Sequence, residues 1–126
     1  FGYRGTTTGK VTAGHGSSSQ FDLNIRLTAS GPDFKHALRS KVPTGNVDLA
    51  PTILHLVGIE PPRSMNGRIL KEILSDGPSP EKVAVKESVE HAAYSKNGKS
   101  YEVELKKFTV GNTDYIDFTK VNRKQK

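Results

Sequence analysis

The pattern of apolar and polar residues predicts a strand followed by two helices. Between residues 21 and 29 apolar and polar residues alternate without interruption, which is typical of a β-strand with one buried face. Residues 48–57 carry apolar side chains at the spacing of one helical stripe, with Asp48 and Gly58 suited to the two helix ends. Apolar spacing at 68–75 predicts a second, short helix. Strand, helix and helix together indicate an α/β fold.

The last third of the chain has a different character. Between residues 81 and 119, β-branched and aromatic residues recur in runs separated by Asn97-Gly98 and Gly111-Asn112, and this predicts an antiparallel β meander. A two-residue turn at Asn97-Gly98 would place Glu90 opposite Leu105. A bulge or a longer loop would remove that mismatch.

These patterns divide the chain into four segments. Residues 1–20 are rich in glycine and predict a loop, residues 21–77 hold the strand and the helices, residues 81–119 form the meander, and residues 120–126 form a basic tail.

Composition narrows the classes of protein. The 126 residues suffice for one domain, but an apolar content of 33% is low for a globular chain, so we expect a thin core or one shared with a missing portion. The chain has no cysteine, which excludes a disulfide framework and thiolate metal sites. Its longest apolar stretch is much too short for a transmembrane helix.

The positive charge of the chain is concentrated at its end. Lysine and arginine number 19 against 13 acidic residues, for a formal net charge of +6. The last seven residues hold four of these basic residues and no acid, so the rest of the chain is close to neutral. A tail contacting nucleic acid or an anionic surface is one function compatible with this arrangement.

Histidines are the candidate chemical groups. His15 lies between two glycines, which allow the backbone and a metal ion to approach closely, yet an isolated Gly-His-Gly also fits a loop histidine without a role. His55 is expected to be half-buried on the predicted helix, whereas His36 and His91 lie among charged residues and are expected on the surface. The chain contains no Walker-type phosphate loop and no nucleophile elbow.

Four stretches of the sequence resemble a known enzyme superfamily. Gly14–Ser17, Thr28–Phe34, Val42–Leu54 and Asn66–Leu70 are similar to the C-terminal part of the alkaline phosphatase superfamily. The branch they most resemble is that of the nucleotide pyrophosphatases and type I phosphodiesterases. The resemblance is strong over about residues 9–75 and looser over the meander.

This resemblance implies a fold and a chemistry. The fold would be the C-terminal portion of an alkaline-phosphatase-like α/β domain, with residues 1–20 as a loop of the active site. His15 would bind one of two divalent metal ions, for which zinc is expected. The nucleophile and the other ligands would lie upstream, so no catalytic residue is expected within this chain.

We therefore expect a C-terminal fragment of a metal-dependent phosphoric ester hydrolase that is inactive by itself. Its partners would be the upstream catalytic portion of the same protein, a small phosphate ester and, for the isolated chain, a second copy paired through residues 21–29. The resemblance favours export from the cytoplasm. The alternatives are a non-catalytic binding module, in which the meander and the basic tail contact nucleic acid or an anionic surface, and a structural domain that has lost its metals.

Overall fold

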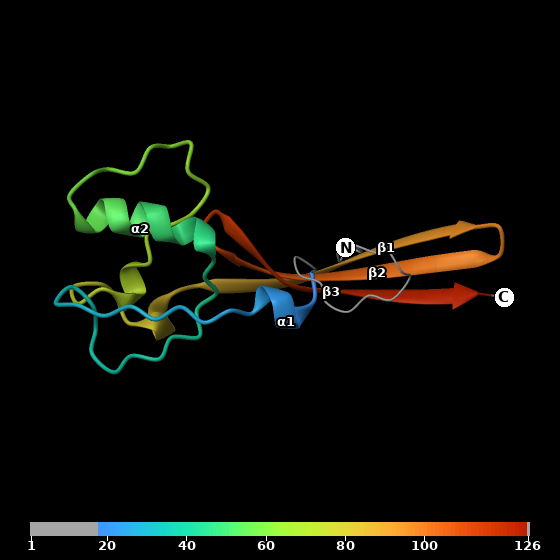
Figure 1. Cartoon of the computed structure of the whole chain (residues 1–126), viewed down its shortest axis with the longest axis horizontal. Helices are drawn as coiled ribbons and strands as arrows, with labels where there is room; N and C mark the ends of the chain where they lie inside the picture. Colours follow the sequence, from blue (N-terminus) through green and yellow to red (C-terminus); the bar gives the residue numbers. More distant parts are fainter. Residues whose placement is uncertain (1–17, 126) are drawn as a thin grey trace, which may run out of the picture. The chain divides into compact units, whose positions relative to one another are not determined.

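The computed structural model describes residues 18–125 (Figure 1). Within this range the chain divides into two compact units. Unit 1 comprises residues 18–26, 87–107 and 116–125, and unit 2 comprises residues 27–86 and 108–115. Both units contain parts of one three-stranded sheet, and unit 2 also holds the longest helix.

Helix α2, Leu49–Leu56, confirms the helix predicted at 48–57. A 3-10 turn, η1 (Asn46–Asp48), leads into it. Pro51 is tolerated in the first turn of α2, because the backbone amide that proline lacks would have no partner within the helix there. The helix ends before Gly58, whose φ of 76° is the left-handed conformation that glycine adopts without strain.

The second predicted helix, at 68–75, is wrong in extent. Only the 3-10 turn η2, Lys71–Ile73, forms there. The amides of Ile73 and Leu74 bond to carbonyls three residues back, as in a 3-10 turn, and the amide of Ser75, which in an α-helix would bond to Lys71, donates instead to the carbonyl of Asp33 at 2.8 Å. The same region continues into a bridge between Phe34 and Leu74 and then into η3, Pro80–Lys82.

The strand predicted at 21–29 is also wrong. Residues Gln20–Leu23 form the short helix α1, capped by the Ser19 hydroxyl, which accepts a hydrogen bond from the amide of Phe21. Residues 24–30 have no regular structure. Among the described residues, the only sheet is that of β1, β2 and β3, so this alternating segment has no neighbouring strand to pair with. Most of its apolar side chains are exposed instead, with Phe21 86% exposed.

The meander is confirmed. Strands β1 (Val85–Lys96), β2 (Lys99–Val110) and β3 (Thr113–Gln125) lie side by side in chain order as an antiparallel sheet (Figure 1). Together with the helices, this sheet agrees with the α/β class. Strand β3 continues to Gln125, so residues 120–125, assigned to a basic tail, extend the strand instead.

The turn between β1 and β2 has two residues. Asn97 and Gly98 have φ angles of 52° and 71°, and two consecutive positive values are typical of a type I′ hairpin turn. The expected mismatch at Glu90 needs neither a bulge nor a longer loop, because the Glu90 carboxylate forms an ion pair of 2.7 Å with Lys107 on the neighbouring strand.

The buried residues of the described chain lie in unit 2, and nearly half of them are polar. The apolar ones come from the η2 region and from the ends of β2 and β3 that face each other across their turn. Besides the buried Pro51 of α2, they are Leu70, Leu74, Val110 and Tyr115, and the polar ones are Asp48, Thr52, Glu72 and Thr113. A core of this composition requires a partner for every buried polar group.

Gly67 provides the first prediction, because it packs directly against the backbone that enters α2. A Cβ atom at this position would overlap the carbonyl group of Val47 and lie 2.9 Å from the amide nitrogen of Asp48. We expect Gly67→Ala to lower the free energy of unfolding by about 3 kcal/mol or more, since backbone atoms cannot yield as a side chain would.

Gly58→Ala is the matched control, because no atom lies within 4 Å of its Cβ position and only its positive φ is costly. We expect a loss of about 1 kcal/mol for this variant. Urea denaturation of both proteins measures the difference. Equal losses would show that the close approach at Gly67 is not a constraint on the fold.

Candidate functional site

The candidate metal ligand, His15, lies outside the described residues, so its role stays a prediction. Its neighbour Ser17 lies outside them as well. The described chain begins at Ser18, whose hydroxyl and carbonyl groups contact the hydroxyl of Thr119, while the Thr119 amide donates to the same carbonyl at 2.8 Å. Ser18 therefore has a structural role in joining the start of the described chain to β3.

The other histidines lie on the surface. His36 and His91 are exposed as expected, and His55, which was expected to be half-buried, is exposed as well. Within residues 18–125, no three His, Asp or Glu side chains lie close enough together to bind a metal ion. The described residues alone thus offer no fit for a metal centre.

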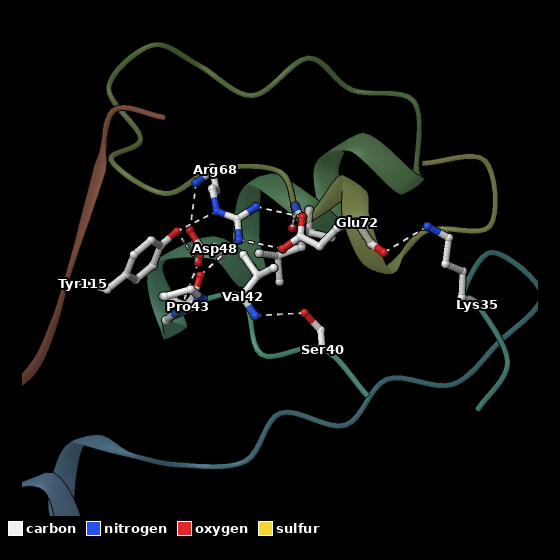
Figure 2. A network of polar contacts seen from close by, with 11 residues as sticks. Lys35, Ser40, Val42, Pro43, Asp48, Arg68, Glu72 and Tyr115 are labelled. Atoms are coloured by element: carbon white, nitrogen blue, oxygen red, sulfur yellow. Dashed lines mark hydrogen bonds and ion pairs between the residues drawn. The ribbon is translucent and has the colours of Figure 1, made fainter. Parts of the chain in front are cut away.

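The most organised polar site of the described chain is in unit 2 (Figure 2). It consists of the side chains of Asp48, Arg68, Glu72 and Tyr115, which we call the Asp48–Arg68 network. These residues come from the turn before α2, the segment around η2 and the start of β3. Each of these four side chains forms a hydrogen bond or an ion pair with another of the four, so the network is continuous.

Asp48 is the acceptor at the centre of the network. Its side chain is fully buried and accepts hydrogen bonds from the amide of Gly45 at 2.9 Å, the amide of Arg68 at 2.8 Å and the hydroxyl of Tyr115 at 2.9 Å. Asp48 was expected to cap α2, but its side chain makes no capping bond to that helix. It joins three segments of the chain instead.

Arg68 is the donor at the centre of the network (Figure 2). Its guanidinium group forms two hydrogen bonds to the carboxylate of Glu72, at 2.6 and 2.8 Å, and donates to the carbonyl of Pro43 and the hydroxyl of Tyr115. Burial alone would raise the pKa of the Glu72 carboxyl, but the hydrogen bonds and charge of Arg68 hold that pKa below its usual value. The bidentate geometry makes this ion pair specific for arginine.

Tyr115 closes the network from the sheet. Burial of its hydroxyl, together with the hydrogen bond that it donates to Asp48, raises the pKa of Tyr115 to about 12. The hydroxyl also accepts a hydrogen bond from Arg68 Nε at 3.0 Å. The phenol is therefore held in its neutral form, as a donor to one charged group and an acceptor from another.

Lys35 supports the far end of the network. Its ammonium group donates to the backbone carbonyls of Glu72, Gly77 and Pro78 at 3.1, 2.9 and 2.5 Å, and so holds the chain around the η2 turn. Its positive charge also helps to lower the pKa of the Glu72 carboxyl.

The arrangement indicates a scaffold rather than a reaction centre. In the described chain, no buried side-chain nitrogen or oxygen lacks a partner, and each charged group of the network is bound by hydrogen-bonding groups of the same chain. Asp48 has no accessible surface through which to take a proton from a substrate. The network was not predicted from the sequence, where its one local signal is the spacing of four residues between Arg68 and Glu72, which fits a salt bridge.

One similar protein among curated proteins is the putative extracellular sulfatase Sulf-1 homolog of Caenorhabditis elegans, which is 36% identical to this chain over 56 residues. The match covers 44% of this chain and 8% of that protein. No protein-family profile and no solved structure matches the chain. In the described residues, no helix has the length and apolarity needed to cross a membrane.

This similarity supports the alkaline phosphatase superfamily and a hydrolase as the type of protein. It does not extend to the phosphodiesterase branch that the sequence resembles.

Tyr115→Phe gives the second prediction. The variant keeps the ring but leaves Arg68 Nε and one bond of Asp48 without a partner, so we expect its free energy of unfolding at pH 8 to be lower by about 1–2 kcal/mol. Because the pKa of Tyr115 is higher in the folded chain than in the unfolded chain, the stabilisation is complete below pH 10 and is lost as the pH rises toward 12.

The stability gap between wild type and Tyr115→Phe should therefore narrow by as much as about 2 kcal/mol between pH 10 and 12. Urea denaturation at pH 8, 10 and 11.5 measures it, and subtraction of the two proteins removes the effect of other titrating groups. A gap that stays constant over this range would contradict the buried position of the hydroxyl.

Glu72→Gln gives the third prediction. It leaves the guanidinium of Arg68 without its opposite charge, so we expect a loss of about 3 kcal/mol at pH 7. The folded pKa of Glu72 is below its unfolded value, so its contribution is present above about pH 4.5 and disappears as the pH falls further.

The difference in the free energy of unfolding between wild type and Glu72→Gln should accordingly become smaller as the pH falls below about 4.5. The exposed Glu60→Gln is the control and should leave stability within about 0.5 kcal/mol of wild type at pH 7. Denaturation at pH 7, 4.5 and 3 tests this, and a loss in the Glu60 variant as large as in the Glu72 variant would contradict the role of the ion pair.

Proposed function

We propose that this chain is part of a metal-dependent phosphoric ester hydrolase of the alkaline phosphatase superfamily. The similarity to the sulfatase homolog, at 36% identity over 56 residues, supports the superfamily and a hydrolase, and His15 with its flanking glycines favours a metal-dependent phosphoric ester as the substrate. The chain spans about 8% of the length of that relative. Most of the catalytic groups of the proposed enzyme would therefore come from sequence outside this chain.

His15 is the residue of this chain proposed to touch the reaction. Its neutral imidazole would bind one of two divalent ions, with zinc expected, and the remaining ligands would come from outside the chain. Such ions would supply activation of the attacking oxygen and stabilisation of charge at the ester. By itself the chain is proposed to be inactive, because one imidazole does not complete a catalytic zinc site.

The described residues would act as a support for this site. The Asp48–Arg68 network holds the backbone before α2 and around η2 through buried hydrogen bonds. Its groups neither donate nor accept a catalytic proton in this proposal. Export of the protein is supported by the word "extracellular" in the relative's name.

Sulfuric ester hydrolysis is the second candidate. It is favoured by the name of the relative, which is a sulfatase. The phosphoric ester is preferred because the sequence Gly-His-Gly around His15 resembles the phosphodiesterase branch. The binding module, in which the meander and the basic tail contact nucleic acid or an anionic surface, is less favoured, since Lys106 and Lys107 are ion-paired with acidic residues of neighbouring strands.

The fourth prediction uses the product of the complete open reading frame, because the proposed active site needs residues from outside this chain. Wild type, His15→Ala and the control His36→Ala are assayed with zinc on aryl phosphate monoesters, diesters and sulfates. We expect hydrolysis by wild type and His36→Ala, and a loss of at least about a hundredfold in kcat for His15→Ala together with loss of bound metal.

The preferred ester then decides between the two candidate reactions. Equal activity of wild type and His15→Ala would overturn the role of His15. The absence of hydrolysis of any ester by a folded, zinc-loaded wild type would overturn the proposed function, and steeply salt-dependent binding of nucleic acid would then favour the binding module.

A further inference from the structure

A hollow of ≈ 730 Å³ opens in unit 2, apart from the predicted metal ligand. One wall of the hollow is the segment of residues 63–68, and the other wall is the turn between β2 and β3. Val47 also lines the hollow. Its size is within the range of sites that bind small organic molecules. Nothing in the proposed hydrolysis uses this hollow.

Both walls are fixed by contacts within unit 2. Gly67 packs against the backbone of Val47, with no room for a side chain. The hydroxyl of Thr113, on the opposite wall, donates to the carbonyl of Asn66 at 3.2 Å. The amide of Arg68 is bound by Asp48 at 2.8 Å. The hollow is therefore largely formed before any ligand arrives, which lowers the entropic cost of binding.

The two arginines of the hollow have different electrostatic states. The guanidinium group of Arg68 is paired with Glu72, and its other hydrogen bonds go to Tyr115 and to the carbonyl of Pro43. Arg63 is exposed, and no carboxylate of the described chain lies within ion-pair distance of it. The acid that lines the hollow, Asp114, accepts a hydrogen bond from Thr109 at 2.6 Å. Arg63 thus presents a guanidinium group that is available to an incoming anion.

The remaining lining suits a hydroxylated carbon skeleton. Asn66 and Asn112 carry amides that can both donate and accept hydrogen bonds. Val47 and Met65 add apolar surface beside them. We propose that the hollow binds a small hydroxylated organic anion: Arg63 pairs with its carboxylate or sulfate, the two amides bind its hydroxyl groups, and the apolar side chains contact its carbon atoms.

The test is a titration of the isotopically labelled 126-residue chain followed by the shifts of its amide resonances. The probes are glucose 6-sulfate and glucuronate, with glucose and sodium sulfate as the partial ligands. We expect saturable shifts confined to residues 63–68 and 110–114 with either charged sugar, and at least tenfold weaker binding of glucose and of inorganic sulfate. The stronger of the two charged sugars identifies the preferred anion.

Two variants test the residues. Arg63→Gln keeps a side chain of similar length without the charge, and we expect it to weaken binding of both charged sugars about tenfold. Arg39→Gln, an exposed arginine away from the hollow, is its matched control and should bind like wild type. Asn112→Ala should weaken binding of the charged sugars and leave that of inorganic sulfate unchanged.

Several results would overturn the proposal. These are shifts that do not saturate, shifts outside the two walls, equal binding by Arg63→Gln and wild type, or inorganic sulfate bound as tightly as the sugar sulfate, which would indicate an adventitious ion only. Because the titration requires no hydrolysis and no metal, its outcome is independent of the assay of His15.

Discussion

The buried carboxylate of Asp48 must be surrounded by hydrogen-bond donors, and the rest of unit 2 is arranged so as to supply them. An ionised carboxylate removed from water is costly unless hydrogen-bond donors replace the water. Here the donors are the amide of Gly45, the amide of Arg68 and the hydroxyl of Tyr115. They come from three segments of the chain, so satisfying one carboxylate fixes the entry to α2, the η2 region and the start of β3 together. Loss of any donor would weaken all three attachments.

Charge balance explains why this network supports a fold and does not carry a reaction. Asp48 and Glu72 contribute two negative charges, and Arg68 and Lys35 contribute two positive charges that lie against carboxylate or carbonyl oxygens. Each charge is directed at a partner within the chain, so little field remains to polarise a substrate. Arg63 differs because its guanidinium has no such partner among the described residues, and this difference separates the proposed ligand site from the scaffold beside it.

Elements whose signals are local could be predicted from the sequence. The apolar spacing of 48–57 and the glycine after it identified α2, and Asn97-Gly98 identified the first hairpin. The network could not be predicted, because Tyr115 lies 47 positions from Arg68 and 67 from Asp48, and no periodicity connects them. The helix at 68–75 failed for a similar reason: the amide of Ser75 found its acceptor in the distant carbonyl of Asp33, and helical propensity is too weak to compete with such tertiary contacts.

The strand predicted at 21–29 shows what an apolar pattern does and does not encode. The alternation of apolar and polar residues indicates which side chains would be buried in a strand. A strand also needs a neighbouring strand to pair with its backbone amides and carbonyls. Phe21 and Ile25 remain exposed in the described chain, as do Leu49, Ile53 and Val57 on one side of α2. In both segments the apolar residues are therefore spaced as the predicted element requires, but these side chains are not buried against other parts of the described chain. The hairpins succeed where this segment fails because each strand of the meander brings its own partner two residues further along the chain.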